Sequence, residues 1–235
     1  MSGATSPGRV APGAIQAPRD LAPLIDHTVL RGDAVEADVA RACEEALRYG
    51  FAGVCVREEH LASAARLLRR SGGAVLPIAV ADFPGGTSPT ARRVEEVRRL
   101  VGTGAAEVDV VYPLPTMAGR AHGAALRDLV AVVQAAGPAR VKVILETGAL
   151  DAAEKAAACA IAVAAGAAYV KTSTGFGPRG ATAEDVALLR AVVGDGVGVK
   201  ASGGIRSALE ALAMVRAGAS RLGTSASVAI VTGHF

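Results

Sequence analysis

Aromatic residues are scarce in this chain of 235 residues. Tryptophan is absent and aromatic side chains make up 3% of the sequence, whereas hydrophobic residues make up 51%. The core must therefore be built from alanine, valine, leucine and isoleucine. Nucleic-acid binding is not expected, because the net charge is only +3 and no basic stripe alternates with aromatic residues.

Patterns typical of metal sites and disulfides are also missing. The three cysteines are far apart and form no CxxC pair: Cys43, Cys55 and Cys159. The four histidines are scattered without the spacing of metal ligands: His27, His60, His122 and His234. We therefore expect no disulfide framework, no metal and no other cofactor. Such cysteine usage fits a reducing compartment, and we expect the cytoplasm.

No apolar segment approaches the length needed to cross a membrane, so no membrane association is expected. Residues 1–19 are rich in Ser, Gly, Pro and Ala and contain no long apolar stretch, which predicts a flexible tail rather than a signal peptide. No change in composition marks a boundary further along the chain. Residues 20–235 are therefore expected to form a single domain.

Short apolar runs alternate regularly with amphipathic segments from about residue 24 onward. Eight strands are predicted at residues 24–28, 52–56, 76–80, 107–111, 141–145, 169–172, 197–201 and 221–224. Helices are predicted between them near residues 34–48, 58–70, 89–101, 120–136, 152–165, 182–193 and 207–217. This alternation demands a parallel sheet and favours an α/β fold of the (β/α)8 TIM-barrel type. The alternative is a doubly wound open sheet, which would usually show a glycine fingerprint after its first strand.

Lysine is used sparingly, and its positions are informative. The chain has only four lysines, and Lys142, Lys171 and Lys200 all lie in or at the end of apolar runs. Arginine stays charged, whereas a buried lysine can lose its proton and attack a carbonyl carbon. The pattern predicts amine chemistry inside a barrel.

The period of two along a strand places Lys171 and Lys200 on the inward face of the predicted barrel. Burial and mutual repulsion of three ammonium groups would lower the pKa of at least one amine. The alternative is that each lysine extends its head group to solvent, with a carboxylate partner such as Glu146. Asp109, between valines, is either an ion-pair partner of the lysines or an acid/base group, and the two roles are compatible.

Glycines lie at or just after the ends of the last two predicted strands. Gly203 and Gly204 follow one strand, and Gly223 and Ser225 lie at the end of the next. Backbone N–H groups in these loops form the usual phosphate site of such barrels. The four residues are therefore expected to bind a phosphate group.

Several short segments carry a resemblance to a known family. The most specific are Tyr-Val-Lys-Thr-Ser-Thr-Gly-Phe at residues 169–176 and Val-Lys-Ala-Ser-Gly-Gly-Ile-Arg at residues 199–206. Further matching segments, in order along the chain, are residues 25–28, 53–56, 83–86, 107–111, 142–147 and 221–225. Together they resemble the class I, Schiff-base family of deoxyribose-phosphate aldolases, which have a (β/α)8 fold.

The resemblance implies reversible cleavage of 2-deoxy-D-ribose 5-phosphate to D-glyceraldehyde 3-phosphate and acetaldehyde. It implies that Lys171 forms the Schiff base, that Lys200 is the nearby proton-handling lysine and that Asp109 is the acid/base carboxylate. Lys142 matches a further active-site lysine. Three other residues of the matching segments are expected to support the active site: Asp26, Thr28 and Thr172.

Other functions stay open at this point. A transaldolase-like or other phosphosugar Schiff-base lyase would use the same fold and lysines, and a barrel without catalysis could bind a phosphorylated ligand. The retention of Lys171, Lys200 and Asp109 together argues against a non-enzymatic role. The expected partners are a phosphosugar and an aldehyde, and the expected assembly is a homodimer.

Overall fold

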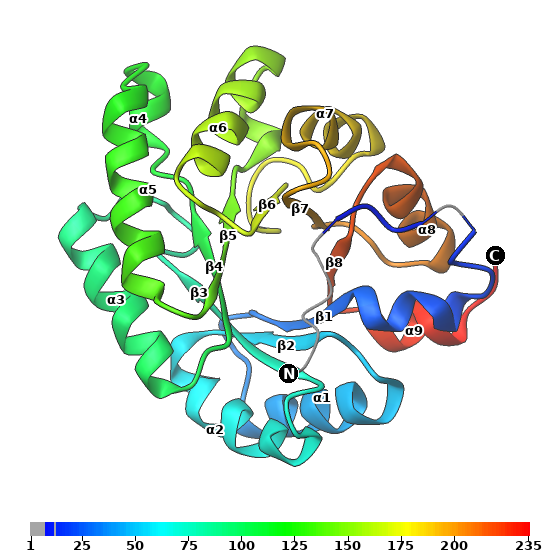
Figure 1. Cartoon of the computed structure of the whole chain (residues 1–235). Coiled ribbons are helices and arrows are strands. Elements are labelled where there is room, and N and C mark those ends of the chain that lie inside the picture. Colours follow the sequence, from blue (N-terminus) through cyan, green and yellow to red (C-terminus); the bar gives the residue numbers. More distant parts are fainter. Residues whose placement is uncertain (1–7, 12) are drawn as a thin grey trace.

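The fold is a closed ring of parallel strands, seen along its axis in Figure 1. The computed structural model describes residues 8–11 and 13–235. The strands follow one another around the ring in chain order: β1 (Ile25–Val29), β2 (Gly53–Val56), β3 (Leu76–Ala81), β4 (Glu107–Val111), β5 (Arg140–Ile144), β6 (Tyr169–Lys171), β7 (Gly198–Ser202) and β8 (Arg221–Thr224). The predicted (β/α)8 barrel is confirmed, and the strand ends lie within one residue of those expected.

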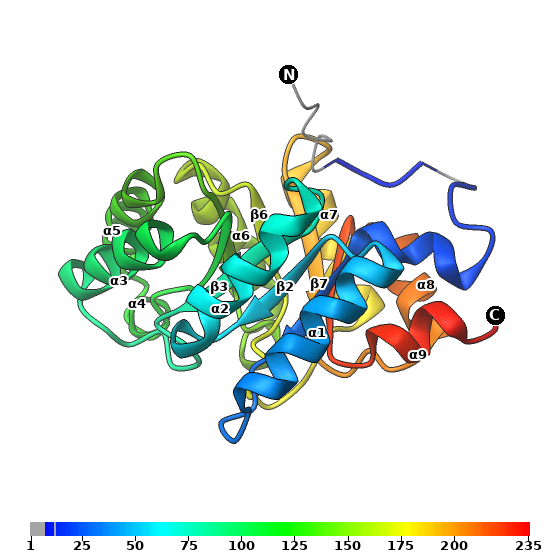
Figure 2. The same cartoon turned by 90° about the horizontal axis from the view of Figure 1, so that it is seen from below.

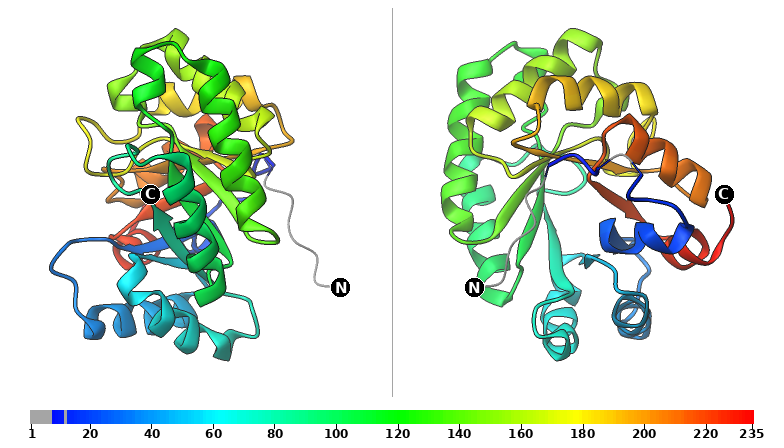
Figure 3. Two further views of the ribbon diagram at one scale, coloured as in Figure 1. Left: turned by 90° about the vertical axis from the view of Figure 1, so that its left-hand side faces the viewer. Right: turned by 45° about the vertical axis from the view of Figure 1, so that its right-hand side comes forward.

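Helices surround the strands on all sides, as the views of Figures 2 and 3 show. The helices are α1 (Glu36–Tyr49), α2 (Glu58–Leu68), α3 (Thr90–Thr103), α4 (Pro115–Ala118), α5 (His122–Ala136), α6 (Ala152–Ala164), α7 (Ala183–Val193), α8 (Ala208–Ala217) and α9 (Ser227–Thr232). Short 3-10 helices are η1 (Pro18–Leu24), η2 (Arg69–Ser71) and η3 (Thr147–Ala149). None of the helices in the described parts of the chain is long and apolar enough to span a bilayer.

The predicted helices all form, and their ends lie within two residues of those expected. Local signals fix several of these ends. Asp151 accepts a hydrogen bond from the backbone N–H of Glu154 and caps α6, and Ser207 caps α8 in the same way through Glu210. Gly218 ends α8 in the left-handed conformation, at φ +119°. The short helices α4 and α9 were not expected from the sequence.

The two faces of the sheet have different cores. Val108 and Val110 point outward into the large apolar cluster between sheet and helices, so alternation turns Glu107 and Asp109 into the barrel. Inside, the β2–β3 side is apolar, since Cys55, Ile78 and Val80 form a separate small cluster there. The remaining inner wall is charged, and this asymmetry places the site.

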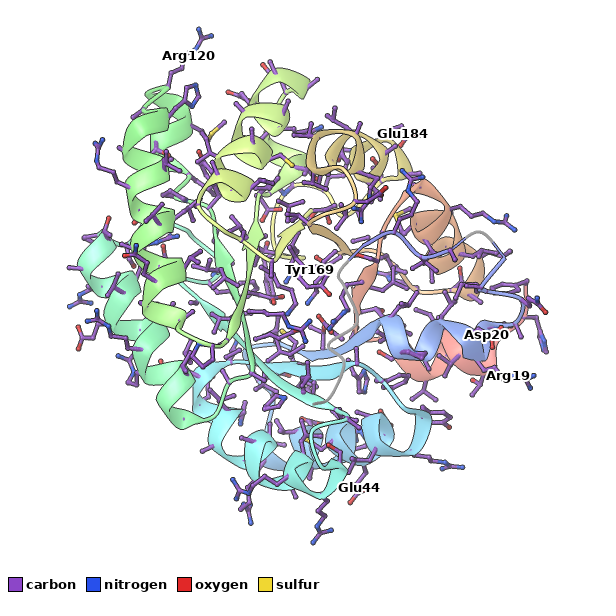
Figure 4. All side chains as sticks on the ribbon, in the orientation of Figure 1. Arg19, Asp20, Glu44, Arg120, Tyr169 and Glu184 are labelled. Atoms are coloured by element: carbon purple, nitrogen blue, oxygen red, sulfur yellow. The ribbon has the colours of Figure 1, made fainter. Side chains whose placement is uncertain are left out.

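The ring of Tyr169 fills the barrel interior near the amino ends of the strands. Tyr169, the first residue of β6, is labelled near the barrel axis in Figure 4. Gly198 on the neighbouring strand makes room for it, because a Cβ atom there would lie 2.1 Å from the Tyr169 ring. The Tyr169 ring therefore occupies space inside the barrel near the amino ends of the strands.

The expected tail, residues 1–19, falls partly outside the described residues, since residues 1–7 and 12 are not described. Val10 and Ile15 pack against the main apolar cluster, and Arg9 lies 3.7 Å from Asp195 in the α7–β7 connection. The 3-10 helix η1 begins at Pro18, just before the boundary expected at residue 20. This segment lies at the amino ends of the strands, away from the glycine-rich loops.

Candidate active site

The strand register brings the predicted lysines and Asp109 together. Asp109 on β4 is paired with Lys142 on β5, and Lys171 on β6 is paired with Lys200 on β7. Paired residues of parallel strands point to the same face, here the barrel interior. Asp109 accepts hydrogen bonds from all three amines: Lys142 at 2.7 Å, Lys171 at 2.8 Å and Lys200 at 2.7 Å.

All four side chains are removed from solvent. Asp109, Lys142 and Lys200 are 0% exposed, and Lys171 is 2% exposed. The alternative in which the lysines extend to solvent is therefore wrong. Glu146 is also not their partner: its carboxylate accepts from the Thr174 hydroxyl at 2.5 Å in the loop after β6.

Two more carboxylates and an arginine complete the cluster. Lys200 also donates to Asp26 on β1, and Lys142 lies 2.7 Å from Glu107. Arg221, at the start of β8, donates to Asp26 at 2.7 Å and to Glu107 at 3.2 Å. Glu107 and Arg221 were missed as site residues. The signal was present, because Glu107 precedes the inward Asp109 by two positions and Arg221 stands at a strand start.

The pKa values separate the three lysines. Burial alone would lower the pKa of Lys142 and Lys200, but nearby carboxylates outweigh it and raise both: Asp109, Glu107 and Asp26 for Lys142, and Asp109 and Asp26 for Lys200. For Lys171, burial dominates; Asp109 opposes it, the Lys200 charge adds to it, and the pKa is lowered. The expectation that at least one amine has a lowered pKa agrees with the direction for Lys171, and the three carboxylates explain why the pKa values of the other two amines are raised instead.

The pKa values of Asp109 and Asp26 are lowered, opposite to those of Lys142 and Lys200. Burial would raise the pKa of Asp109 and of Asp26, but the surrounding cations hold both below their usual range. For Asp109 these cations are the three lysines, and for Asp26 they are led by Lys200 and Arg221. Both groups are therefore carboxylates at neutral pH.

A cavity of about 660 Å³ opens above the cluster at the carboxyl ends of the strands. Lys171 lines this cavity, whereas Asp109, Lys142 and Lys200 lie beneath it. Of the three barrel lysines, Lys171 is thus the one placed to meet a ligand. Its lowered pKa and its position at the cavity point to the same amine as nucleophile.

The predicted phosphate loops form one wall of the cavity. Gly203, Gly204, Gly223 and Ser225 all line it. Gly204 has φ +80° and free space where a Cβ would be, so its backbone faces the cavity without obstruction. Thr224 joins the two loops by donating its hydroxyl to the Ile205 carbonyl at 2.7 Å.

Gly223 has a second role, which the sequence did not reveal. A Cβ at this position would lie 2.9 Å from Cε of Lys200 and 3.0 Å from the Ser202 side chain. Glycine here leaves room for the buried stem of Lys200. The phosphate loop and the lysine cluster therefore share this residue.

The three supporting residues have different positions. Asp26 lies inside the lysine cluster, and Thr28 lines the cavity while its hydroxyl donates to the Asp26 carbonyl at 2.9 Å. Thr172 points away from the cavity, and its hydroxyl bonds both the carbonyl and the N–H of Ser202. Thr172 thus holds β6 to β7 rather than facing a ligand.

The cavity is also lined by residues without a predicted role. His27 lies between the Ser227 hydroxyl, at 2.7 Å, and the Glu45 carboxylate, at 2.8 Å, and so joins β1, α1 and α9. Phe176 is 53% exposed and contacts Phe83 edge to face, with ring centroids 5.4 Å apart. These contacts join segments distant in sequence, so no local pattern could predict them.

The fold and site define a class: a (β/α)8-barrel enzyme with its active site at the carboxyl ends of the strands. Residues 21–232 match the family described as DeoC/LacD family aldolase. The chain is 48% identical over 215 residues to the deoxyribose-phosphate aldolase of Geobacillus sp. (strain WCH70), an alignment that covers 91% of this chain and 96% of that protein. The chain therefore belongs to the DeoC/LacD family of aldolases.

Other relatives agree with this assignment. The deoxyribose-phosphate aldolase of Thermococcus gammatolerans is 45% identical over 216 residues, which cover 91% of this chain and 96% of that protein. The deoxyribose phosphate aldolase of Aeropyrum pernix, whose structure is described as tetrameric, is similar in fold with a TM-score of 0.85. The two share 34% identity, and the match covers 93% of this chain and 92% of that one.

Proposed function

We propose that this aldolase reversibly cleaves 2-deoxy-D-ribose 5-phosphate to D-glyceraldehyde 3-phosphate and acetaldehyde, with Lys171 as the Schiff-base lysine. The observation that carries the proposal is the position of Lys171. It lines the cavity, it has a lowered pKa, and it shares the cavity with the glycine-rich loops. The names of the relatives support the choice of substrate.

In this proposal the neutral Lys171 amine attacks C1 of the open-chain sugar, and loss of water gives an imine. The protonated imine then accepts the electron pair of the breaking C2–C3 bond as the C3 hydroxyl loses its proton. Glyceraldehyde 3-phosphate leaves, and an enamine of acetaldehyde remains on Lys171. Protonation at C2 and hydrolysis of the imine release acetaldehyde and restore the amine.

Asp109 and Lys200 handle the protons in this scheme. Lys200 stays an ammonium because carboxylates raise its pKa, so it keeps Lys171 neutral and serves as a proton donor. Asp109 contacts both amines and, through a water molecule, moves protons at the C3 hydroxyl and at C2. Lys142 and Asp26 hold Asp109 and Lys200 in place.

The phosphate group binds at the loops after β7 and β8. Backbone N–H groups at Gly203, Gly204 and Gly223 and the hydroxyl of Ser225 are the proposed donors. Charge-assisted hydrogen bonds of this kind contribute about 1.5–3 kcal/mol each. The phosphate would thus anchor the far end of the sugar and leave C1 near Lys171.

A coupled assay tests the proposal. Deoxyribose 5-phosphate is supplied in the presence of a chelator, and release of glyceraldehyde 3-phosphate is followed with a dehydrogenase. The wild-type protein should turn over, and Lys171→Arg should lose activity while keeping its circular dichroism spectrum. Lys155→Arg, which replaces a lysine outside the barrel interior, is the matched control and should stay active.

Two results would reject the proposal in different ways. Turnover by Lys171→Arg would show that another group is the nucleophile. Absence of cleavage, combined with transfer of a dihydroxyacetone unit between sugars, would show a transaldolase-like enzyme.

Assembly and location are separate proposals. We expected a homodimer, and the tetramer described for the Aeropyrum pernix relative does not fit that expectation. Light scattering on the eluting protein decides between dimer and tetramer. The cytoplasm remains the proposed location, and fractionation of cells that express the chain tests it.

A further inference from the structure

The charged cluster inside the barrel contains more bases than acids. Its buried members among the described residues are three carboxylates and four bases: Asp26, Glu107, Asp109, Lys142, Lys171, Lys200 and Arg221. Arg140 also lies 3.2 Å from Glu107, but its side chain is 32% exposed at the barrel rim, so we do not count it among the buried members. All have side chains exposed by 9% or less, so water screens their charges weakly. With one base neutral, the cluster is balanced.

The surplus base can be traced through the contacts. Lys142 touches Glu107 and Asp109, and Lys200 touches Asp26 and Asp109. Arg221 touches Asp26 and Glu107. Lys171 reaches only Asp109 among the carboxylates, and shares it with the other two lysines. Lys171 is therefore the base with the least compensation.

We infer that Glu107 and Arg221, below the lysines and out of reach of the cavity, are positioning residues that set the protonation state of Lys171 through the charge balance of the barrel interior. Neither residue touches the cavity, so neither is expected to contact the substrate. The charge of Glu107 acts through Lys142, which shares Asp109 with Lys171. The charge of Arg221 acts through Asp26 and Lys200, and Lys200 also shares Asp109 with Lys171. The inference deepens the proposed function, on which it rests.

The surroundings of Lys171 leave few other titrating groups to account for its state. Asp109 faces it from β4, Lys200 from β7 and the Cys55 thiol from β2. Burial is the main reason why the pKa of Cys55 is raised to about 11, so Cys55 is uncharged at neutral pH. Lys142 on β5 and Asp26 on β1 act through Asp109 and Lys200.

Opposite changes of charge at Glu107 and Arg221 should shift the titration midpoint of Lys171 in opposite directions. Glu107→Gln removes a negative charge, increases the positive surplus and should shift the titration midpoint of Lys171 to lower pH. Arg221→Met removes a positive charge and should shift the midpoint to higher pH. A buried charge acting across the barrel corresponds to a shift of roughly one pH unit in either case.

The midpoint is measured without turnover, from the pH dependence of carbamoylation of Lys171 by cyanate. The neutral amine adds to isocyanic acid and gives a carbamoyl-lysine, which peptide mass analysis locates. A small reference amine in the same tube corrects for the reagent's own ionisation. The acid limb of kcat/KM for deoxyribose 5-phosphate should shift in parallel, because it reports the free enzyme.

Three further variants serve as controls. Tyr169→Phe removes the hydroxyl that accepts from Arg221 at 3.2 Å but changes no charge, so the midpoint should stay in place. The double variant Glu107→Gln/Arg221→Met restores the balance and should return the midpoint close to the wild-type value. If Arg221→Met fails to fold, Arg140→Gln replaces it, since Arg140 lies 3.2 Å from Glu107 at the barrel rim. It should give a smaller shift to higher pH.

The inference is overturned if Glu107→Gln and Arg221→Met lose activity while the titration midpoint of Lys171 stays in place. It is also overturned if both variants shift that midpoint in the same direction. The proposed function fails separately: if wild-type protein does not cleave the phosphosugar but the midpoints shift in opposite directions, the charge balance stands and the assigned reaction does not.

Discussion

The lysine cluster and the phosphate loops are neighbours in the same active site but are built by different means. The cluster consists of charged side chains on strand residues, each buried and held by two or more partners, except for Lys171. The loops after β7 and β8 offer backbone groups, and their key positions are glycines with no side chain at all. The lysine cluster depends on buried charge, whereas the phosphate loops depend on open space beside the backbone.

This difference predicts different responses to mutation. Changes in the cluster alter proton affinity and the chemical step, because each charge there is linked to several others. Changes in the loops alter the binding of one end of the substrate. The Lys200–Gly223 contact is where the two regions meet, so a mutation at Gly223 should affect both.

The largest effect is expected for Lys200→Leu. Without the Lys200 ammonium, Lys171 keeps its proton to higher pH and a proton donor is lost, so kcat should fall by about a thousandfold or more, equivalent to roughly 4 kcal/mol. The pH optimum should move upward. Lys200→Arg restores charge but not geometry and should rescue only part of the rate. Steady-state kinetics between pH 6 and pH 10 would detect both changes, and near wild-type turnover in the leucine variant would refute the role.

Asp26→Asn should lower stability in addition to changing the charge balance of the cluster. It leaves Lys200 and Arg221 without one buried partner, which typically costs about 3–5 kcal/mol at neutral pH. The pKa of Asp26 is lower in the folded than in the unfolded state, so its contribution is present above about pH 4 and is lost as the pH falls further. Urea unfolding should show the gap between variant and wild type narrowing below about pH 4. A gap independent of pH would contradict this account.

Gly204→Val tests whether the phosphate loops act on substrate binding separately from the lysine cluster. The valine would fill space in the cavity at a backbone conformation that favours glycine, and KM for deoxyribose 5-phosphate should rise by about 10–100-fold, or roughly 1.4–2.7 kcal/mol. Unphosphorylated deoxyribose should be affected much less. Gly72→Val is the matched control, because Gly72 also has positive φ and open space but follows η2, away from the cavity. Equal losses for both substrates would reject the phosphate site.

The smallest effect is expected for Phe176→Ala. The ring lines the cavity and contacts Phe83, and such aromatic contacts contribute about 0.5–1.5 kcal/mol. KM should rise a few-fold, with kcat and the pH optimum unchanged. A shifted pH optimum would show that the cavity wall influences the lysine cluster, and would weaken the separation of the two regions.

Much of this architecture follows from local sequence. Apolar runs locate the strands, and alternation within them is enough to turn Lys171, Lys200 and Asp109 inward. The Gly203-Gly204 pair after β7 and the Gly223-Thr224-Ser225 segment at the end of β8 locate the anion loops. These features depend on short segments, so a single sequence carries them.

The connections between distant strands could not be predicted in the same way. The match of Glu107 with Lys142, and of Arg221 with Asp26, depends on barrel closure and register between β4 and β5 and between β8 and β1. The different pKa shifts of the three lysines depend on how many carboxylates each one reaches. His27 belongs to a matching segment but has no predicted role, and it binds Ser227 and Glu45 from two helices.

The central claim is that Lys171 carries the imine, and borohydride trapping tests it most directly. Wild-type protein is incubated with acetaldehyde and sodium borohydride, and the modified peptide is identified by mass. We expect loss of activity together with a single ethyl group on Lys171, and no label on Lys171→Arg, which should still fold. A label on Lys142 or Lys200, or turnover by Lys171→Arg, would contradict it.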